Sequence, residues 1–117
     1  MNNIFVWKNG ERLAENYLKK LGYKILEKNA RNRYAEIDII AEDDEDVVFV
    51  EVKSRTSAKY GLPSEAVDRK KQRGYIMFAQ CYVVAKRMAD KNIRFDVIEI
   101  LDDQINHILS AFDGNIY

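Results

Sequence analysis

The stretch FVEVKSR, residues 49–55, decides the fold that we expect for this chain. It continues the apolar run VVFV of residues 47–50, and a run that is apolar on both faces is typical of a central strand covered above and below. Glu51 and Lys53 then interrupt the run. Because strand residues alternate between faces, both side chains point the same way. Either the strand has reached solvent, or it holds two charges for chemistry.

The segment before this strand completes a β-hairpin. Residues 34–41, YAEIDIIA, predict a strand, and the acidic residues 42–46, EDDED, predict the turn. Pairing about this turn places Asp38 opposite the region from Phe49 to Glu51, so that both carboxylates come within reach of one cation. A carboxylate at the margin of a covered strand is costly unless it is paired or bound to a metal.

Helices and further strands are predicted on both sides of the hairpin. Leu13, Tyr17 and Leu18 recur at helical spacing and predict a helix over residues 8–21, which Gly22 ends. Further strands are predicted at residues 23–29, 93–100 and, at the edge of the sheet, 105–112.

A second, longer helix is predicted after the loop of residues 54–63. Ser64 is the expected N-cap residue, and Glu65 is favourable in the first turn. The predicted apolar stripe comprises Val67, Lys71, Gly74, Phe78, Cys81, Ala85 and Met88. We therefore expect Cys81 to be a buried small hydrophobe. Lys71 is expected to extend from the apolar face toward solvent, and Gly74 to allow close packing on the sheet.

These elements follow the order α-β-β-β-α-β, with one more strand at the edge. That order indicates an α/β fold with a central mixed β-sheet flanked by helices. The 117 residues suffice for one domain, residues 1–117. The single cysteine excludes an internal disulfide, and no apolar run reaches the roughly 18 residues of a membrane span. We expect a cytoplasmic location and no membrane contact.

Charge is distributed unevenly although the formal net charge is zero. Residues 36–51 hold eight acids and no base, and residues 52–94 hold eleven bases and three acids. An acidic cluster beside a basic segment suits a metal site next to a phosphate-binding surface. Uneven solvation of exposed faces is the alternative explanation, and the charge distribution alone does not separate the two.

The pair Asp38 and Glu51 predicts a site for Mg²⁺ or Mn²⁺, since these ions favour a few carboxylate oxygens completed by water and phosphate. Lys53 could hold a phosphate oxygen or orient an attacking water beside the ion. Such a site suits the hydrolysis of a phosphodiester bond. An acid and a lysine two residues apart also commonly form a solvated strand face with a weak surface pair.

Five stretches, in order, resemble the YraN family: GERLAENYLKKLGYKILEKNAR, AEIDIIA, VFVEVKSR, SEAVDRKKQ and RFDVIEI, from about Gly10 to Ile100. An Asp followed by Glu-x-Lys on the next strand is also similar to the core of the PD-(D/E)xK nuclease superfamily. The family is related in fold to archaeal Holliday-junction resolvases. The resemblance implies a restriction-endonuclease-like fold and a nuclease-type site for Mg²⁺ or Mn²⁺.

The resemblance also implies roles for individual residues. Glu11, Asp38, Glu51 and Lys53 match the catalytic set, in which the three acids hold the metal. Glu15, one helical turn after Glu11, is the alternative ligand.

Three further residues, Glu36, Arg55 and Lys71, match second-layer or phosphate-binding positions. Ala35 replaces the glycine of the family's Gly-Glu-Ile-Asp, which puts close approach of nucleic acid there in doubt. A basic rim is expected from Arg55, Lys59, Arg69, Lys70 and Arg73, and the loop residue Tyr60 is a weak candidate for base stacking.

The expected function is metal-dependent, endonuclease-like hydrolysis of DNA, with branched or structured DNA among the candidate substrates. A catalytically inactive nucleic-acid-binding module on a nuclease scaffold is the alternative. A protein-interaction domain is a third class, and it predicts neither metal nor DNA binding. The resemblance is also compatible with a homodimer.

Overall fold

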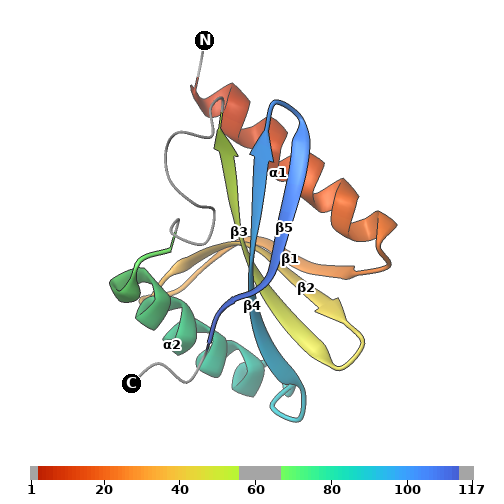
Figure 1. Ribbon diagram of the computed structural model, residues 1–117. Helices are drawn as coiled ribbons and strands as arrows, with labels where there is room; N and C mark the ends of the chain where they lie inside the picture. Colours follow the sequence, from red (N-terminus) through yellow and green to blue (C-terminus); the bar gives the residue numbers. More distant parts are fainter. Residues whose placement is uncertain (1–2, 56–66, 114–117) are drawn as a thin grey trace.

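The computed structural model describes residues 3–55 and 67–113 and confirms the predicted α/β class (Figure 1). Along the chain, the elements are α1 (Asn3–Lys20), β1 (Lys24–Arg31), β2 (Glu36–Asp43), β3 (Asp46–Arg55), α2 (Arg69–Ala85), β4 (Asn92–Leu101) and β5 (Gln104–Phe112). The predicted order of helices and strands is therefore confirmed, including the additional strand. None of the described helices is both long and apolar enough to cross a membrane.

The five strands form one mixed sheet in the order β1-β2-β3-β4-β5. β3 and β4 are parallel, and the other neighbouring pairs are antiparallel. The parallel pair requires a long connection, which α2 supplies, whereas short turns join the antiparallel strands. β5 lies at the edge of the sheet, as predicted.

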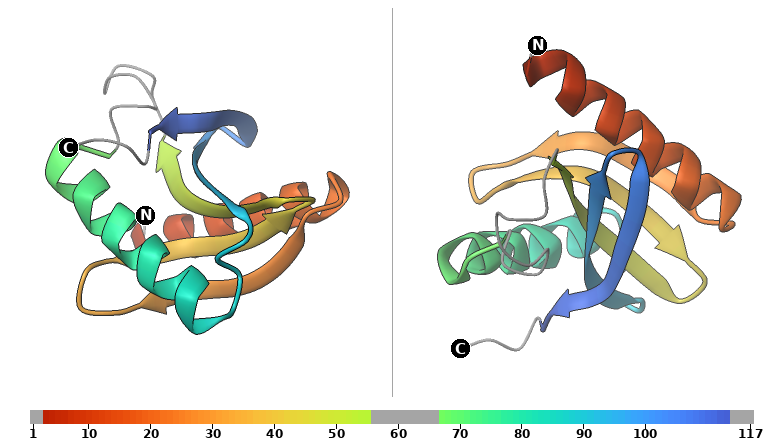
Figure 2. Two further views of the ribbon diagram at one scale, coloured as in Figure 1. Left: turned by 90° about the horizontal axis from the view of Figure 1, so that it is seen from below. Right: turned by 45° about the horizontal axis from the view of Figure 1, so that its top comes forward.

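The two helices cover opposite faces of the sheet (Figure 2). On one face, Leu18 of α1 packs with Val48 and Val50 of β3. On the other face, Tyr75 of α2 packs in the cluster that contains Phe49. β3 is thus covered above and below, as its apolar run predicted, and Glu51 and Lys53 continue the face of Phe49 toward α2.

Helix α1 begins at Asn3, five residues before the predicted start, and ends close to the predicted position. Gly22 follows it with a φ of 94°. The Tyr23 N–H donates to the Leu18 carbonyl at 3.0 Å, and the Gly22 N–H donates to the Lys19 carbonyl at 3.0 Å. These two bonds form a Schellman motif, in which glycine accepts the left-handed conformation without steric cost.

Helix α2 begins at Arg69, and its N-cap is Asp68, whose Oδ1 accepts a hydrogen bond of 2.8 Å from the Lys71 N–H. The prediction that Ser64 caps this helix is therefore wrong. Both Ser64 and Glu65 lie outside the described residues. Asp is as good an N-cap residue as Ser, so composition alone did not distinguish the two positions.

The buried face of α2 differs from the predicted stripe. It consists of Tyr75, Ile76, Phe78, Ala79 and Val83, whereas Cys81 is exposed. The prediction of a buried Cys81 is wrong because Cys81 is two residues from both Ala79 and Val83. Two residues correspond to about 200° around a helix.

Candidate functional site

Asp38 and Glu51 lie side by side on the hairpin, as the sequence predicts. The register pairs Ile39 of β2 with Val50 of β3, so Asp38 and Glu51 are the next opposed positions. Both residues are buried, at 9% and 6% exposure. The Val52 N–H donates to Asp38 Oδ2 at 2.8 Å, which fixes the Asp38 carboxylate against β3.

The electrostatics of this pair are unfavourable when both groups are charged. Burial, followed by the charge of Glu51, raises the pKa of Asp38 to about 7, although the bond from Val52 lowers it. Two adjacent carboxylates in a poorly solvated place favour binding of a proton or a cation. A proton or a nearby cation would therefore relieve the repulsion within the pair.

Glu11 and Glu15, the two candidates for the third acid, have different surroundings. Glu11 is buried, and its Oε2 has no hydrogen-bond partner among the described residues. Burial raises the pKa of Glu11, and the charges of Glu36 and Glu51 contribute. Glu15 instead pairs with Lys19 at 2.9 Å and Lys28 at 3.0 Å, and these hydrogen bonds lower its pKa. The structure brings Glu11 into electrostatic range of the pair, whereas the negative charge of Glu15 is already paired with two lysines.

Lys71 is the lysine that contacts the carboxylate pair in this structure. Its Nζ lies 3.0 Å from Glu51 Oε2, and its side chain is 42% exposed. The hydroxyl of Tyr75, one helical turn later, donates to the same oxygen. Lys53 is half-buried and lies beside Glu99 in the β3–β4 register. The predicted catalytic role of Lys53 stays a prediction.

The pocket around the pair has a volume of about 570 Å³ and opens between the β1–β2 hairpin and the start of α2. Its lining residues are Tyr34, Ala35, Glu36, Asp38, Glu51, Asp68, Lys70, Lys71, Gly74 and Tyr75. We refer to it as the carboxylate pocket. The lining thus combines four acids with two lysines of α2.

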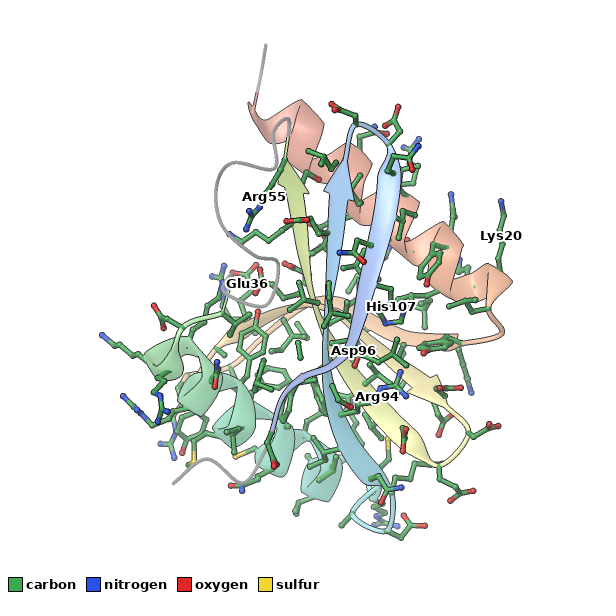
Figure 3. All side chains as sticks on the ribbon, viewed as in Figure 1. Lys20, Glu36, Arg55, Arg94, Asp96 and His107 are labelled. Carbon is green, nitrogen blue, oxygen red and sulfur yellow. The ribbon has the colours of Figure 1, made fainter. Side chains whose placement is uncertain are left out.

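The remaining predicted residues lie near the edge of this region. Glu36 lines the carboxylate pocket and forms an exposed ion pair with Arg31 at 2.9 Å. Arg55 Nε lies 3.0 Å from Glu99 Oε2 at the end of β3. Figure 3 shows Glu36 and Arg55 on the side of the sheet where α2 begins. Glu99 was not predicted as a partner, although it shares a strand face with the buried Val97.

Gly74 positions the edge of the pocket. A Cβ atom at Gly74 would lie 2.7 Å from the Tyr34 carbonyl oxygen, so only glycine permits this approach of α2 to the β1–β2 loop. Asn32 stabilises that loop, since its Oδ1 accepts a 2.8 Å hydrogen bond from the Tyr34 N–H. The predicted close packing of Gly74 therefore involves the loop before β2.

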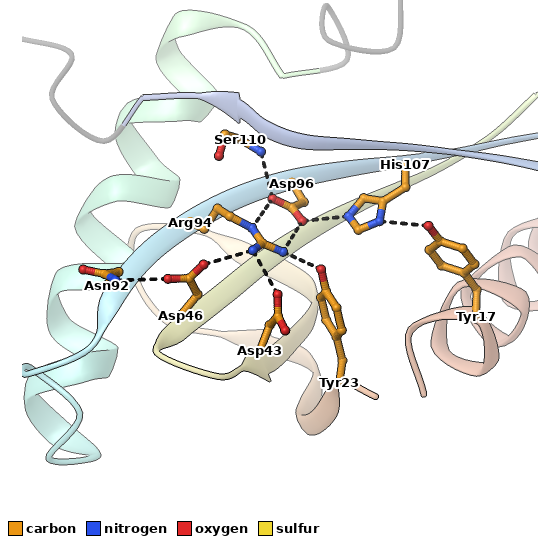
Figure 4. Close-up of polar contacts among 9 residues, drawn as sticks. All are labelled: Tyr17, Tyr23, Asp43, Asp46, Asn92, Arg94, Asp96, His107 and Ser110. Atoms are coloured by element: carbon orange, nitrogen blue, oxygen red, sulfur yellow. Dashed lines mark hydrogen bonds and ion pairs between the residues drawn. The ribbon is translucent and has the colours of Figure 1, made fainter. Parts of the chain in front are cut away.

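A second polar cluster, which the sequence pattern did not predict, lies on the opposite face of the sheet, beside α1. We call it the arginine cluster; it comprises Tyr17, Tyr23, Asp43, Asp46, Arg94, Asp96 and His107 (Figure 4). The only sequence signal was the spacing of Arg94 and Asp96, which places two opposite charges on the apolar α1 face of β4.

Every charge in the centre of this cluster is paired. The Asp96 carboxylate accepts from His107 Nε2 at 2.7 Å and from Arg94 at 3.0 Å. Arg94 also contacts Asp46 at 3.0 Å. Burial raises the pKa of Asp96, but the bonds from His107 and Arg94 outweigh it and the pKa is lowered. This arrangement stabilises the charged state of Asp96 and joins the ends of several elements.

The residues of the carboxylate pocket fit a divalent cation by their chemistry. Asp38 and Glu51 line the pocket and have the oxygen ligands that Mg²⁺ and Mn²⁺ prefer; Glu11, whose Oε2 is unpartnered, does not line the pocket but is within electrostatic range of Glu51. Within residues 3–55 and 67–113, no three or more His, Cys, Asp or Glu side chains are already grouped to hold a metal ion. A bound ion would have Asp38 and Glu51 as its two carboxylate ligands, and water or Glu11 would supply the remaining oxygens.

Comparison with known proteins gives the same family for the family model and for each relative described below. The model of "Uncharacterised protein family UPF0102" matches residues 10–100. The chain is 48% identical over 113 residues to a UPF0102 protein of Persephonella marina, covering 94% of this chain and 97% of the relative. A UPF0102 protein of Clostridioides difficile is 47% identical over 114 residues, covering 96% and 100%. A third, from Caldanaerobacter subterraneus, is 45% identical over 119 residues, covering 96% and 98%.

The matched region contains each stretch on which the resemblance to the YraN family rested, from Gly10 to Ile100. It includes Glu11, Asp38, Glu51 and Lys53. The chain belongs to the UPF0102 family, which is the YraN family.

Proposed function

We propose that this protein is a divalent-metal-dependent nuclease that hydrolyses phosphodiester bonds in DNA. The observation that carries the proposal is the buried pair of Asp38 and Glu51 on adjacent strands of the carboxylate pocket. Burial and the charge of Glu51 raise the pKa of Asp38 to about 7, which is the expected property of a carboxylate placed to receive a cation.

In this proposal, Asp38 and Glu51 hold Mg²⁺ or Mn²⁺, and Glu11 completes the ligand set. The ion, when bound, supplies positive charge to the phosphate and activates a water molecule. The Val52 N–H holds the Asp38 carboxylate in its orientation. Lys53 lies on the same strand face as Glu51 and, in this proposal, steadies a phosphate oxygen.

Positive side chains of α2 support DNA as the substrate. Lys70 and Lys71 line the pocket, and Arg69 and Arg73 are exposed in the same first turns of the helix. Such groups contact backbone phosphates without selecting a base sequence. The helix N-terminus adds a partial positive charge. Lys59 and Tyr60, which we also predicted to contact DNA, lie outside the described residues.

The test is a gel assay on linear, nicked and four-way-junction DNA with Mg²⁺ or Mn²⁺. Asp38→Ala and Glu51→Ala should each lower the cleavage rate about 100-fold or more, because metal-assisted charge stabilisation is worth several kcal/mol. Glu45→Ala is the matched control, since Glu45 is an exposed acid in the turn of the same hairpin. Cleavage by the two pocket variants at the rate of the control would refute the assignment.

The alternative is a DNA-binding module without turnover, and one observation favours it. Glu51 Oε2 already accepts from Lys71 and Tyr75, so the oxygen is occupied without a metal. Calorimetric titration with Mn²⁺ separates the two functions. Retained DNA binding with no Mn²⁺ binding would support the module, and loss of both would support a protein-interaction domain.

The proposal extends to the setting in which the protein works. We propose that it works in the cytoplasm, where DNA is accessible, and as a homodimer, which the resemblance to resolvases is compatible with. Sedimentation of the purified chain tests the dimer directly, since a single species at the monomer mass would contradict it.

A further inference from the structure

A single carboxylate oxygen in the pocket accepts contacts from two side chains of α2. Glu51 Oε2 accepts from the Lys71 ammonium at 3.0 Å and from the Tyr75 hydroxyl. Tyr75 is 1% exposed and neutral, since burial and the charge of Glu51 raise its pKa. Lys71 differs, because its flexible side chain is 42% exposed and its charge is positive. Of the two donors, Lys71 is the one that is free to leave.

A divalent cation and an ammonium group compete for this oxygen. Both are positive, and in a poorly solvated pocket their repulsion at a shared ligand is stronger than in water. We propose that Lys71 is a metal-released phosphate ligand: it pairs with Glu51 in the metal-free protein and moves to a backbone phosphate of DNA when a divalent cation binds Glu51. This inference rests on the proposed function, in which Asp38 and Glu51 hold that cation.

The surroundings of Lys71 leave phosphate as its favourable new partner. The nearby acid Asp68 already caps α2, and its Oδ1 accepts the Lys71 N–H at 2.8 Å. Glu36, at the rim, is paired with Arg31. Lys70 and the N-terminus of α2 make the mouth of the pocket attractive to anions.

Metal and DNA must therefore bind cooperatively. Without metal, transferring Lys71 to a phosphate leaves Glu51 without its counter-charge. With metal, the transfer has no such cost. Thermodynamic linkage requires the same coupling in both directions, so DNA should also tighten metal binding.

The experiment measures Mn²⁺ binding by calorimetry in wild type, Lys71→Gln and Lys70→Gln. Lys70 is the matched control, because it lines the same pocket one residue away, and no ion pair joins it to Glu51 within the described residues. Lys71→Gln should bind Mn²⁺ about two- to fivefold more tightly than wild type, which is the range for removing a partly exposed ion pair. Lys70→Gln should show a smaller change.

A second measurement follows a fluorescent DNA duplex by anisotropy, with and without Ca²⁺, which also takes oxygen ligands. The Ca²⁺-induced gain in DNA affinity should be about two- to fivefold larger in wild type than in Lys71→Gln. Lys70→Gln should lose affinity equally with and without Ca²⁺. Lys71→Arg keeps the positive charge and should keep the wild-type coupling.

Two results would overturn the inference. One is Mn²⁺ binding by Lys71→Gln that is no tighter than that of Lys70→Gln. The other is an equal Ca²⁺-induced gain in wild type and Lys71→Gln. If wild type still binds Mn²⁺ and cleaves DNA, only the role of Lys71 fails; if wild type does not bind Mn²⁺, the proposed metal site itself fails.

Discussion

Two buried aspartates on opposite faces of the same sheet have opposite acidities. Asp96, at 1% exposure, has a lowered pKa because His107 and Arg94 outweigh the effect of burial. Asp38, at 9% exposure, has a pKa raised to about 7 because the charge of Glu51 adds to burial. Both aspartates are buried to a similar extent, so the charge of the neighbouring group decides whether the pKa is raised or lowered. The arginine cluster stabilises the fold, whereas the carboxylate pocket keeps an unfavourable charge that a ligand can relieve.

The largest expected effect comes from breaking the arginine cluster. Arg94→Met should lower the free energy of unfolding by about 3 kcal/mol, because it leaves the Asp96 carboxylate buried without its guanidinium partner. Urea unfolding at neutral pH measures the change. Arg73→Met, at an exposed position of α2, is the control and should alter stability by less than about 0.5 kcal/mol. A similar small change for Arg94→Met would contradict the structural role of the cluster.

The edge of the carboxylate pocket should be sensitive to one methyl group. Gly74→Ala gains helix propensity, but its Cβ would lie 2.7 Å from the Tyr34 carbonyl oxygen. We expect a net loss of about 1 kcal/mol, because overpacking outweighs propensity. Thermal unfolding measures the loss, with Gln80→Ala on the exposed face of α2 as the control. A stability gain in both variants would show that the loop does not press on the helix.

Replacing Asp38 by Asn should raise the free energy of unfolding above neutral pH, whereas replacing Asp96 by Asn should lower it. The folded pKa of Asp38, about 7, exceeds its ordinary 3.8, so its contribution to stability is complete below the ordinary value and is lost as pH rises through 7. Asp38→Asn keeps an acceptor for the Val52 N–H and should gain about 1 kcal/mol at about pH 8 and little at about pH 5.

Asp96→Asn is the matched variant for this contrast. The lowered pKa of Asp96 means that its contribution is present above the ordinary value and is lost as pH falls. The variant should therefore be destabilised at neutral pH, and less so in acid. Urea unfolding at several pH values measures both changes in stability. If Asp38→Asn and Asp96→Asn changed the stability in the same direction at about pH 8, the contrast between the two aspartates would be wrong.

The smallest expected difference separates Glu11 from Glu15. Glu15→Gln should lose about 0.5 kcal/mol, because it breaks partly exposed pairs with Lys19 and Lys28. Glu11→Gln should be neutral or slightly stabilising above neutral pH, since burial raises the pKa of Glu11. Mn²⁺ titration of both variants then shows which acid serves the metal. Weaker binding by Glu15→Gln alone would reverse our assignment.

Much of the fold was predictable because its signals are local. The apolar run of β3, the acidic turn after β2 and Gly22 after α1 depend on neighbouring residues, and the structure confirms each of them. The start of α2 was less predictable, because Asp68 and Ser64 are both good N-cap residues. Cys81 was placed on the wrong face because several apolar stripes fit that helix, and only packing against Phe49 and Phe95 selects one.

The candidate site was partly predictable for the same reason. Hairpin geometry brings Asp38 and Glu51 together over a short span of sequence, so counting residues from the turn sufficed. The contacts of Lys71 and Tyr75 with Glu51 depend on how α2 lies on the sheet. Those contacts join residues at least twenty positions apart, and no local pattern encodes them.

Local sequence patterns were enough to predict the order of strands and helices, the α/β class, the family and the pairing of Asp38 with Glu51. Packing of the helices on the sheet, in contrast, selects the buried face of α2 and the lysine that contacts Glu51, and it brings Arg94, Asp96 and His107 together beside α1. Periodicity and turn chemistry act between neighbours, whereas burial and charge pairing depend on distances that exist only once the sheet and helices have packed.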